Sequence, residues 1–288
     1  MAAASGAVEP KPERLFIGET TIDPESDETT TIHGEESLLR EAIASYETCS
    51  SEKSSRCVKG NFGSVYNINV RGVNYYMKKI EVPNNRRLTI IREIYAAIQL
   101  TEKIPDHVSK LIGSYLHKGG DTSTGYLLFE ALPGMTLLQL ILGKNRAHYK
   151  EIACSLKEAV RALYRAGFVH RDIKPENVFV VIPPEGSGLE YKCVLIDFGF
   201  TVPIRAKVGA AGTLKYMPPA LRTMMNRTAA KPSHNIYSIE QILKEDLKVD
   251  DVDCLSRGEN KAAGGIGGKR KTRRARTAKR RRTRSTLT

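Results

Sequence analysis

The sequence has no stretch that is long and apolar enough to cross a membrane. A membrane-spanning helix needs about 18 or more apolar residues in a row, and the best candidate, "YLLFEALPGMTLLQLILG", is interrupted by Glu130 and Pro133. The N-terminus also lacks the basic segment followed by an apolar segment that marks a secretory signal. We therefore expect a soluble protein that is not secreted and does not span a membrane.

Cysteine is scarce, and its spacing shows no pattern. The chain has five cysteines, an odd number, and no two of them stand in C-x-x-C spacing. Such usage is not typical of a disulfide framework or a structural zinc site. The sequence thus predicts a reducing compartment, inside the cell.

Acidic residues are absent from the end of the chain. The net charge is +13, and 12 of the 45 Lys and Arg residues lie between Lys261 and Thr288, where there is no Asp or Glu. The rest of the chain is nearly neutral. Residues 1–50 are rich in acidic and hydroxyl side chains, and we expect an acidic, largely disordered arm there, with a possible helix at "SLLREAIASY". A folded domain is expected over 51–258, followed by a glycine-rich spacer and basic tail at 259–288.

The pattern of apolar residues in the central region predicts an α+β fold. "GSVYNINV" and "VNYYMKKI" predict a β-hairpin, and "NVFVV" and "KCVLIDFG" predict two later strands. Three segments have apolar residues at helical spacing: "RRLTIIREIYAAIQL", "HYKEIACSLKEAVRALYRAG" and "NIYSIEQILKEDL". In the last of these we expect Ile236, Ile239, Leu243 and Leu247 to face inward.

"HRDIKPENVFV", residues 170–180, has the composition of a site for phosphoryl transfer. Such a site must orient the attacking hydroxyl and place positive charge near the phosphates. Asp172 is a candidate to orient and deprotonate the hydroxyl, and Lys174 is a candidate to stabilise the transferred phosphoryl group. His170 is expected to be a packed scaffold residue.

Four further residues complete this constellation. Asn177 and Asp197 supply oxygen ligands of the kind that Mg²⁺ prefers. Lys78, on a predicted strand, is a candidate to bind the phosphates of a nucleotide, and Glu93, on the following predicted helix, is its natural partner. The sequence therefore predicts a site for a nucleotide with Mg²⁺.

These residues occur in six segments whose order resembles that of the eukaryotic-type protein kinases, in their serine/threonine branch. The segments are "YYMKKI", "REI", "HRDIKPEN", "DFG", "GTLKYMPPA" and "NIYSIE". The resemblance implies a two-lobed kinase fold, with a β-rich N-lobe to about residue 132 and a shortened, mainly helical C-lobe from about 133. It also implies Mg²⁺-dependent transfer of the ATP γ-phosphate to Ser or Thr hydroxyls of a protein substrate. Lys174 and Thr213 match the serine/threonine branch.

The same resemblance implies which residues surround the nucleotide. Phe129 is placed at the gate of the adenine pocket, and Tyr76 is placed on the strand face that points toward the base. Glu130 and Leu132 are expected to offer backbone groups to the base. The remaining cofactor-binding candidates, in and beside the glycine loop "VKGNFGSV", are Val58, Gly60, Gly63 and Val65.

Two alternatives to an active kinase remain open. The first follows from several residues that depart from the family pattern. Val58 stands in place of a glycine, Tyr76 in place of a small alanine, Ala220 in place of a glutamate and Asn235 in place of an aspartate, and few residues follow the last predicted helix. The first alternative is a pseudokinase or scaffold module.

The second alternative assigns the main function to the basic tail, as a nucleic-acid-binding segment at 269–284. The composition of the tail is similar to that of tails on proteins of large DNA viruses. We expect an intracellular location, in the cytoplasm or nucleus, and for a viral protein in the host cell or virion.

Overall fold

The computed structural model describes residues 15–17, 20–22, 30–52, 65–144, 146–222, 228–249 and 254. The chain divides into two units, Met1–Val252 and Asp253–Thr288, and the fold described below belongs to the first. Val58, Gly60, Gly63 and the basic tail lie outside the described residues. Within the described residues, no helix combines the length and apolar character that a membrane span requires.

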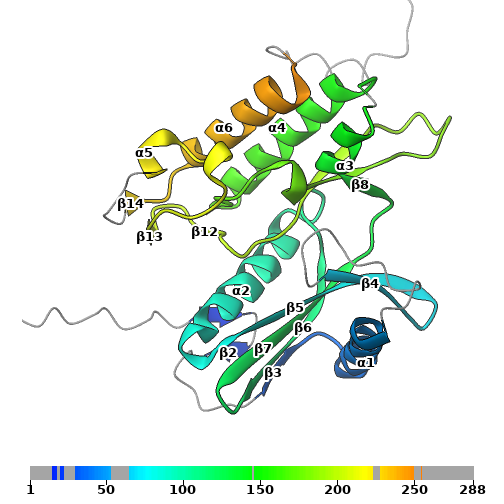
Figure 1. Cartoon of the computed structure of the whole chain (residues 1–288), viewed down its shortest axis with the longest axis vertical. Helices are drawn as coiled ribbons and strands as arrows, with labels where there is room; N and C mark the ends of the chain where they lie inside the picture. Colours follow the sequence, from blue (N-terminus) through cyan, green and yellow to red (C-terminus); the bar gives the residue numbers. More distant parts are fainter. Residues whose placement is uncertain are drawn as a thin grey trace, which may run out of the picture. The chain divides into compact units, whose positions relative to one another are not determined.

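The N-lobe is built on a five-stranded antiparallel sheet with the order β3-β6-β7-β5-β4 (Figure 1). The predicted hairpin is confirmed, since Val65 pairs with Lys78 and Val70 pairs with Val73. Arg71 and Gly72 form its turn with φ angles of 52° and 79°, as a tight hairpin with two left-handed central residues requires. The strands are β3 (Thr30–His33), β4 (Val65–Val70), β5 (Val73–Pro83), β6 (Leu111–Gly119) and β7 (Thr122–Glu130).

Helix α2 (Arg87–Lys103) packs its apolar stripe on one face of this sheet, after the short helix η1 (Asn84–Arg86). Ile90, Ile94, Ala97 and Ile98 are all buried, as the helical spacing predicts. Glu93 lies on the same buried face of the helix, so packing of the apolar stripe also carries a carboxylate into the interior.

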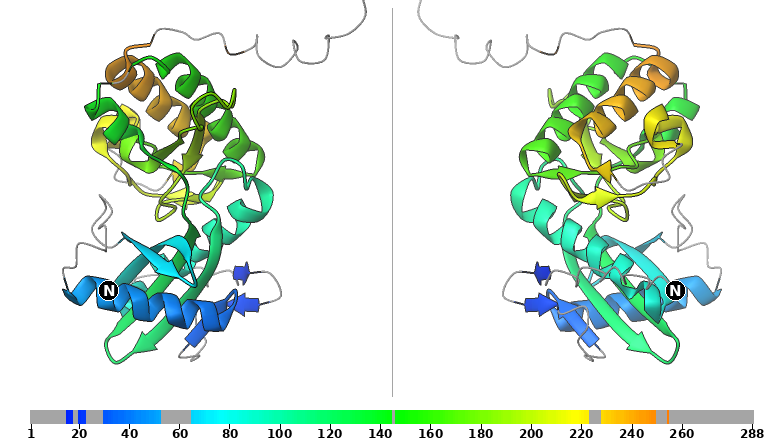
Figure 2. Two further views of the ribbon diagram at one scale, coloured as in Figure 1. Left: turned by 90° about the vertical axis from the view of Figure 1, so that its right-hand side faces the viewer. Right: turned by 90° about the vertical axis from the view of Figure 1, so that its left-hand side faces the viewer.

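The opposite face of the sheet is covered by helix α1 (Glu36–Glu52), which confirms the possible helix at "SLLREAIASY". The prediction of a largely disordered arm is wrong for residues 30–52, the part of the arm that the structure describes continuously. Leu39, Ala42 and Tyr46 are buried and pack in one cluster with side chains of β4, β5 and β7. Figure 2 shows this helix, in blue, lying against the sheet. The apolar residues of the segment are few, but they share one helix face, and burial of that face stabilises the helix.

Helix α4 (Tyr149–Arg165) forms the centre of the C-lobe, beside α6 (Pro232–Gln241) (Figure 1). Ile152, Leu156, Ala159 and Leu163 are fully buried. Gly167 ends this segment with φ 90°, a left-handed conformation that suits glycine. The later predicted strands are β10 (Val178–Val181) and β11 (Lys192–Leu195), which pair antiparallel, and β10 also pairs with β8 (Gly134–Thr136).

The other elements of the C-lobe are short and carry the catalytic and closing segments. They are α3 (Leu137–Leu142), β9 (Phe168–Val169), η2 (Pro175–Asn177), β12 (Val202–Pro203), β13 (Lys207–Val208), η3 (Leu214–Tyr216), α5 (Pro219–Arg222), β14 (Thr228–Ala229) and the π-helical turn η4 (Ile242–Leu247). A separate pair of strands, β1 (Leu15–Ile17) and β2 (Thr20–Ile22), lies near the N-terminus.

The inward face of α6 differs from the prediction at one position. Ile239, Leu243 and Leu247 are buried as expected, but the side chain of Ile236 is half exposed. Asn235 and Ser238 face inward, since both bond to the rest of the C-lobe. Polar contacts therefore set the rotation of this helix, and apolar spacing alone does not show them.

The cysteines also differ from the prediction. Cys49, Cys154 and Cys254 are each disulfide-bonded, and Cys193 is free and buried. Burial raises the pKa of the Cys193 thiol to about 12, so it stays protonated at neutral pH. Disulfide formation depends on which segments approach each other in space, and the spacing of cysteines along the chain does not determine this.

Candidate active site

A lysine on the sheet joins two carboxylates, one from each lobe. Lys78 of β5 places its Nζ 2.6 Å from Oε1 of Glu93 in α2 and 2.8 Å from Oδ1 of Asp197, which follows β11. The sequence-predicted trio is therefore brought together. Because Glu93 is buried, its carboxylate depends on this ammonium for a partner.

The pKa shifts of the trio follow from burial and charge together. Burial alone lowers the pKa of Lys78, but Glu93 and Asp197 outweigh this effect and raise it above its usual value. Burial raises the pKa of Glu93, against the opposing effect of Lys78. At Asp197 the net effect is the opposite. Burial alone raises the pKa of this carboxyl group, but Lys78 outweighs burial and lowers the pKa. The site thus holds a charged ammonium beside an ionised Asp197 at neutral pH.

Asp172 is oriented by hydrogen bonds to both of its carboxylate oxygens. Oδ1 accepts from the backbone N and the Oγ1 of Thr213, each at 2.8 Å. Oδ2 accepts from Nδ2 of Asn177 at 3.0 Å and pairs with Nζ of Lys174 at 3.2 Å. Lys174 also donates to Oγ1 of Thr213, at 3.1 Å. The carboxylate is therefore fixed in direction and kept beside a positive charge, as a group that must orient a hydroxyl requires.

The backbone of this site adopts unusual conformations at two non-glycine residues. Arg171 and Asp197 have φ angles of 72° and 65°, in the left-handed region, where a non-glycine residue costs of order 1–3 kcal/mol. Asn235 stabilises the first of these, since its Oδ1 accepts from the backbone N of Arg171 at 3.2 Å. Asparagine therefore braces the catalytic loop where the family has an aspartate.

Gly212 is required next to this loop. A Cβ at Gly212 would lie 2.2 Å from the carbonyl oxygen of Arg171, so no other residue fits without a shift of the backbone. Its φ is 103°. This close approach brings the neighbouring Thr213 within hydrogen-bond distance of Asp172.

His170 is fully buried, and its Nε2 lies 3.1 Å from the carbonyl oxygen of Ile196. Its ring packs edge-on against Phe198, with centroids 5.9 Å apart. Burial lowers the pKa of His170, so the ring is neutral. These contacts give the residue the scaffold role that the sequence predicts.

Asn177 and Asp197 fit the requirements of a Mg²⁺ site. Oδ1 of Asn177 is buried and has no hydrogen-bond partner within the described part of the chain, although its Nδ2 is bonded to Asp172. A buried acceptor without a donor is costly unless something else binds it. Asp197 lies in the neighbouring segment, since the backbone N of Ile196 donates to the carbonyl oxygen of Asn177 at 3.1 Å, and it would add carboxylate oxygens; phosphate oxygens and water normally complete the shell of Mg²⁺.

The residues predicted to surround the base lie around the junction of the lobes where the structure describes them. Val65 begins β4 opposite Lys78, and Glu130 ends β7. Leu132 follows in the connection from β7 to β8. The backbone N of Glu130 donates to the carbonyl oxygen of Lys110 at 3.0 Å, which holds this connection in place.

An aromatic contact across the lobes was missed by the sequence analysis. The ring of Tyr76, on β5, packs against Phe179, on β10, with centroids 6.4 Å apart and an interplanar angle of 61°. Tyr76 also lies directly opposite Phe129 in the strand register. The sequence did offer one signal for this contact: Phe179 lies two residues after Asn177, a residue of the candidate site. An aromatic pair therefore joins the two lobes at the place where the resemblance implies a base.

Arg171 contacts the segment that follows Asp197. Its guanidinium donates to the carbonyl oxygen of Gly209 at 2.6 Å and to that of Phe200 at 3.5 Å. The guanidinium of Arg171 thus has backbone oxygens as hydrogen-bond partners in a segment that carries no phosphate group.

The sheet, the helix bearing Glu93, and the paired catalytic and metal-binding loops define a kinase-type phosphotransferase fold. The family model for the protein kinase domain matches residues 52–261, well over half of the sequence, and the chain belongs to this family.

The curated relatives are serine/threonine protein kinases at modest identity. The chain is 29% identical over 158 residues to the serine/threonine-protein kinase mos of Xenopus laevis, covering 53% of this chain and 42% of the relative. It is 28% identical over 171 residues to Aurora kinase A-A of Xenopus laevis, covering 57% and 39%. It is 31% identical over 170 residues to the serine/threonine-protein kinase CG17528 of Drosophila melanogaster, covering 56% and 22%. The matches thus span less than half the length of each relative.

Proposed function

We propose that this protein is a serine/threonine protein kinase that transfers the γ-phosphate of ATP to a protein hydroxyl with Mg²⁺. The observation that carries the proposal is the network around Asp172, which contacts Lys174 and Asn177 of its own loop and Thr213 from a distant part of the chain. These contacts place a positive charge and a buried amide beside the carboxylate, as the transfer of a phosphoryl group requires. Family membership and the names of the relatives support the same reaction.

In this mechanism each charged group of the site has a separate role. Lys78, directed by Glu93, binds phosphate oxygens of the nucleotide. Asp172 accepts a hydrogen bond from the incoming Ser or Thr hydroxyl and takes its proton as the hydroxyl oxygen bonds to the γ-phosphorus; the bond from that phosphorus to the β–γ bridging oxygen breaks, and ADP leaves. Lys174 lies beside Asp172 and stabilises negative charge on the transferred group. Asn177 and Asp197 would hold Mg²⁺, which neutralises phosphate charge when bound.

The pseudokinase alternative rests on Val58, Tyr76 and the shortened C-lobe that the sequence predicts. Of these, Tyr76 lies within the described residues, and its ring contacts Phe179 at the place that the resemblance assigns to the base. The catalytic network is nevertheless assembled, and this favours an enzyme.

Incubation of the purified chain with labelled ATP, Mg²⁺ and a general protein substrate, beside Asp172→Asn, tests the choice. Transfer by the wild type and none by the variant supports the kinase. Nucleotide binding without transfer by either supports the scaffold.

The basic tail suggests a second activity that is compatible with the first. Between Lys269 and Arg284, eleven of sixteen residues are Lys or Arg. Such density favours electrostatic binding to the phosphates of DNA or RNA. We propose that the tail binds nucleic acid without sequence preference and that the protein works in the cytoplasm or nucleus, of a host cell if it is viral. Imaging of tagged full-length and tail-deleted chains tests the location.

A further inference from the structure

A carboxylate at the end of the last helical segment contacts two neighbouring residues of the closing segment, residues 213–217. Oδ1 of Asp246, in η4, pairs closely with Nζ of Lys215, and Oδ2 accepts a hydrogen bond from the hydroxyl of Tyr216 at 2.9 Å. The Asp246 side chain is only 13% exposed. Both of its oxygens are thus used at a site that water reaches poorly.

The same helical segment also holds the backbone of Tyr216. Oγ of Ser238, in α6, donates to the carbonyl oxygen of Tyr216 at 2.9 Å. The residue is therefore attached at both ends, through its hydroxyl to Asp246 and through its carbonyl to Ser238. Burial raises the pKa of the Tyr216 hydroxyl to about 12, so this group remains a donor at neutral pH.

Tyr216 is connected to Asp172 through one tight turn, which ends at Thr213. The backbone N of Tyr216 donates to the carbonyl oxygen of Thr213 at 3.0 Å, which closes the turn η3. Thr213 in turn donates two hydrogen bonds to Oδ1 of Asp172. A short turn with its own hydrogen bond transmits displacement, because few backbone dihedral angles can absorb it.

We propose that Asp246 is a positioning residue for phosphoryl transfer, acting on Asp172 through Tyr216 and Thr213. The inference rests on the proposed kinase function. Ala220, close by in α5, is exposed and has no charge with which to anchor this segment. Asp246 supplies that anchor from a different element. Because Lys78, Glu93 and Asp197 form a separate set of contacts, the anchor should affect the acceptor side of the reaction and spare the nucleotide side.

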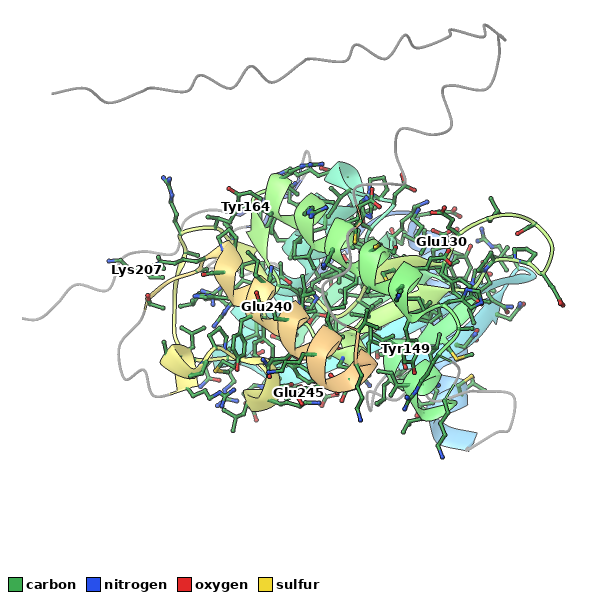
Figure 3. The ribbon with its side chains drawn as sticks, turned by 90° about the horizontal axis from the view of Figure 1, so that it is seen from above. Glu130, Tyr149, Tyr164, Lys207, Glu240 and Glu245 are labelled. Carbon is green, nitrogen blue, oxygen red and sulfur yellow. The ribbon has the colours of Figure 1, made fainter. Side chains whose placement is uncertain are left out.

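The test compares Asp246→Asn with Glu245→Gln. Both variants remove one negative charge from adjacent positions of η4, but Glu245 is exposed and lies on the surface (Figure 3). For Asp246→Asn we expect kcat on a peptide substrate to fall between about tenfold and a hundredfold, the loss typical of a misplaced catalytic group. KM for ATP should stay within about twofold of the wild type. Glu245→Gln should match the wild type in both.

A second measurement does not depend on catalytic activity and reports directly on the contacts between Asp246 and the closing segment. Amide hydrogen exchange of residues 213–217 should be faster in Asp246→Asn and unchanged in Glu245→Gln. Asp246→Glu, which keeps the carboxylate, should recover part of both the kcat and the protection. Tyr216→Phe removes only the hydroxyl bond and should show the same pattern more weakly, which keeps the test available if Asp246→Asn does not fold.

The outcomes separate the two proposals. An Asp246→Asn variant that matches Glu245→Gln in kcat and exchange overturns the positioning role and leaves the kinase function standing. Faster exchange together with an equal fall in kcat and ATP affinity also overturns it, because general destabilisation then explains the loss. A wild type that transfers no phosphate overturns the proposed function and the catalytic role of Asp246 with it, whereas exchange still reports whether the anchor exists.

Discussion

Thr213 donates both its backbone N–H and its hydroxyl to the same oxygen of Asp172, each at 2.8 Å. The catalytic loop and the closing segment, far apart in the sequence, therefore meet at the carboxylate that we propose orients the acceptor hydroxyl. The hydroxyl of Thr213 also lies 3.1 Å from Lys174. The closing segment thus organises the catalytic residues directly, and the proposed reaction depends on this arrangement.

Asp172→Asn should lower kcat for phosphoryl transfer by at least about a hundredfold, because an amide cannot take the proton of the hydroxyl. Nucleotide affinity should change little, since Asp172 acts on the acceptor. Single-turnover kinetics and a nucleotide titration measure the two effects. Glu185→Gln, a change of the same kind in an exposed loop, is the matched control. Equal turnover by Asp172→Asn and the wild type would rule out the assignment.

Lys78→Met should weaken ATP binding as well as turnover, because Lys78 carries the positive charge that meets the phosphates. The control is Lys79→Met on the adjacent position of β5, where Nζ of Lys79 pairs with Glu47 at 3.0 Å on the other face of the sheet. An ATP titration measures this effect, and identical ATP affinity in the two lysine variants would contradict the role of Lys78.

Asp197→Asn should instead raise the Mg²⁺ concentration needed for half-maximal binding of ATP. A titration of Mg²⁺ measures this effect.

Tyr76→Ala should tighten nucleotide binding or admit bulkier adenine analogues, because the base no longer has to separate Tyr76 from Phe179. Overfilled sites typically cost about 1–3 kcal/mol. Tyr75→Ala changes the same residue type on the other face of β5 and should leave the affinity unaltered. Weaker binding by Tyr76→Ala would show that the ring stacks on the base productively.

Catalysis should not require phosphorylation between Gly199 and Pro218. The hydroxyl residues there are Thr201, which is buried, Thr213, bonded to Asp172, and Tyr216, bonded to Asp246. The guanidinium of Arg171 is already occupied by the carbonyl oxygens of Gly209 and Phe200. Phosphatase treatment should therefore leave kcat unchanged, and loss of activity on treatment would refute this expectation.

The basic tail should bind nucleic acid with strong salt dependence. If roughly 6 to 10 of its charges meet duplex phosphates, log affinity should fall with log salt at a slope of about −5 to −9. Truncation after Gly268 should abolish this binding and spare catalysis on a free peptide. Its control is a full-length chain with the tail Lys and Arg changed to Gln, which should behave like the truncation. Affinity that stays flat from low to moderate salt, or that survives truncation, would sink the idea.

The sequence by itself determined the candidate site residues that the structure brings together, the hairpin over β4 and β5 and the helices α2 and α4. Lys78, Glu93, Asp172, Asn177 and Asp197 were identifiable because each lies in a short motif, and the order of the motifs is itself a signal. The hairpin and helices were identifiable because apolar spacing depends only on near neighbours in the chain.

Only the tertiary structure decided which polar and weakly apolar residues face inward. The few apolar side chains of α1 predicted only a possible helix in an otherwise disordered arm, whereas in the structure they cover one face of the sheet. Asn235 and Ser238 displace Ile236 from the buried face because their partners, Arg171 and Tyr216, are distant in sequence. The same holds for the contacts of Tyr76 with Phe179 and of Asp246 with Tyr216. Local spacing encodes the burial of apolar side chains, whereas a buried polar or aromatic side chain needs a specific partner, and folding alone brings that partner near.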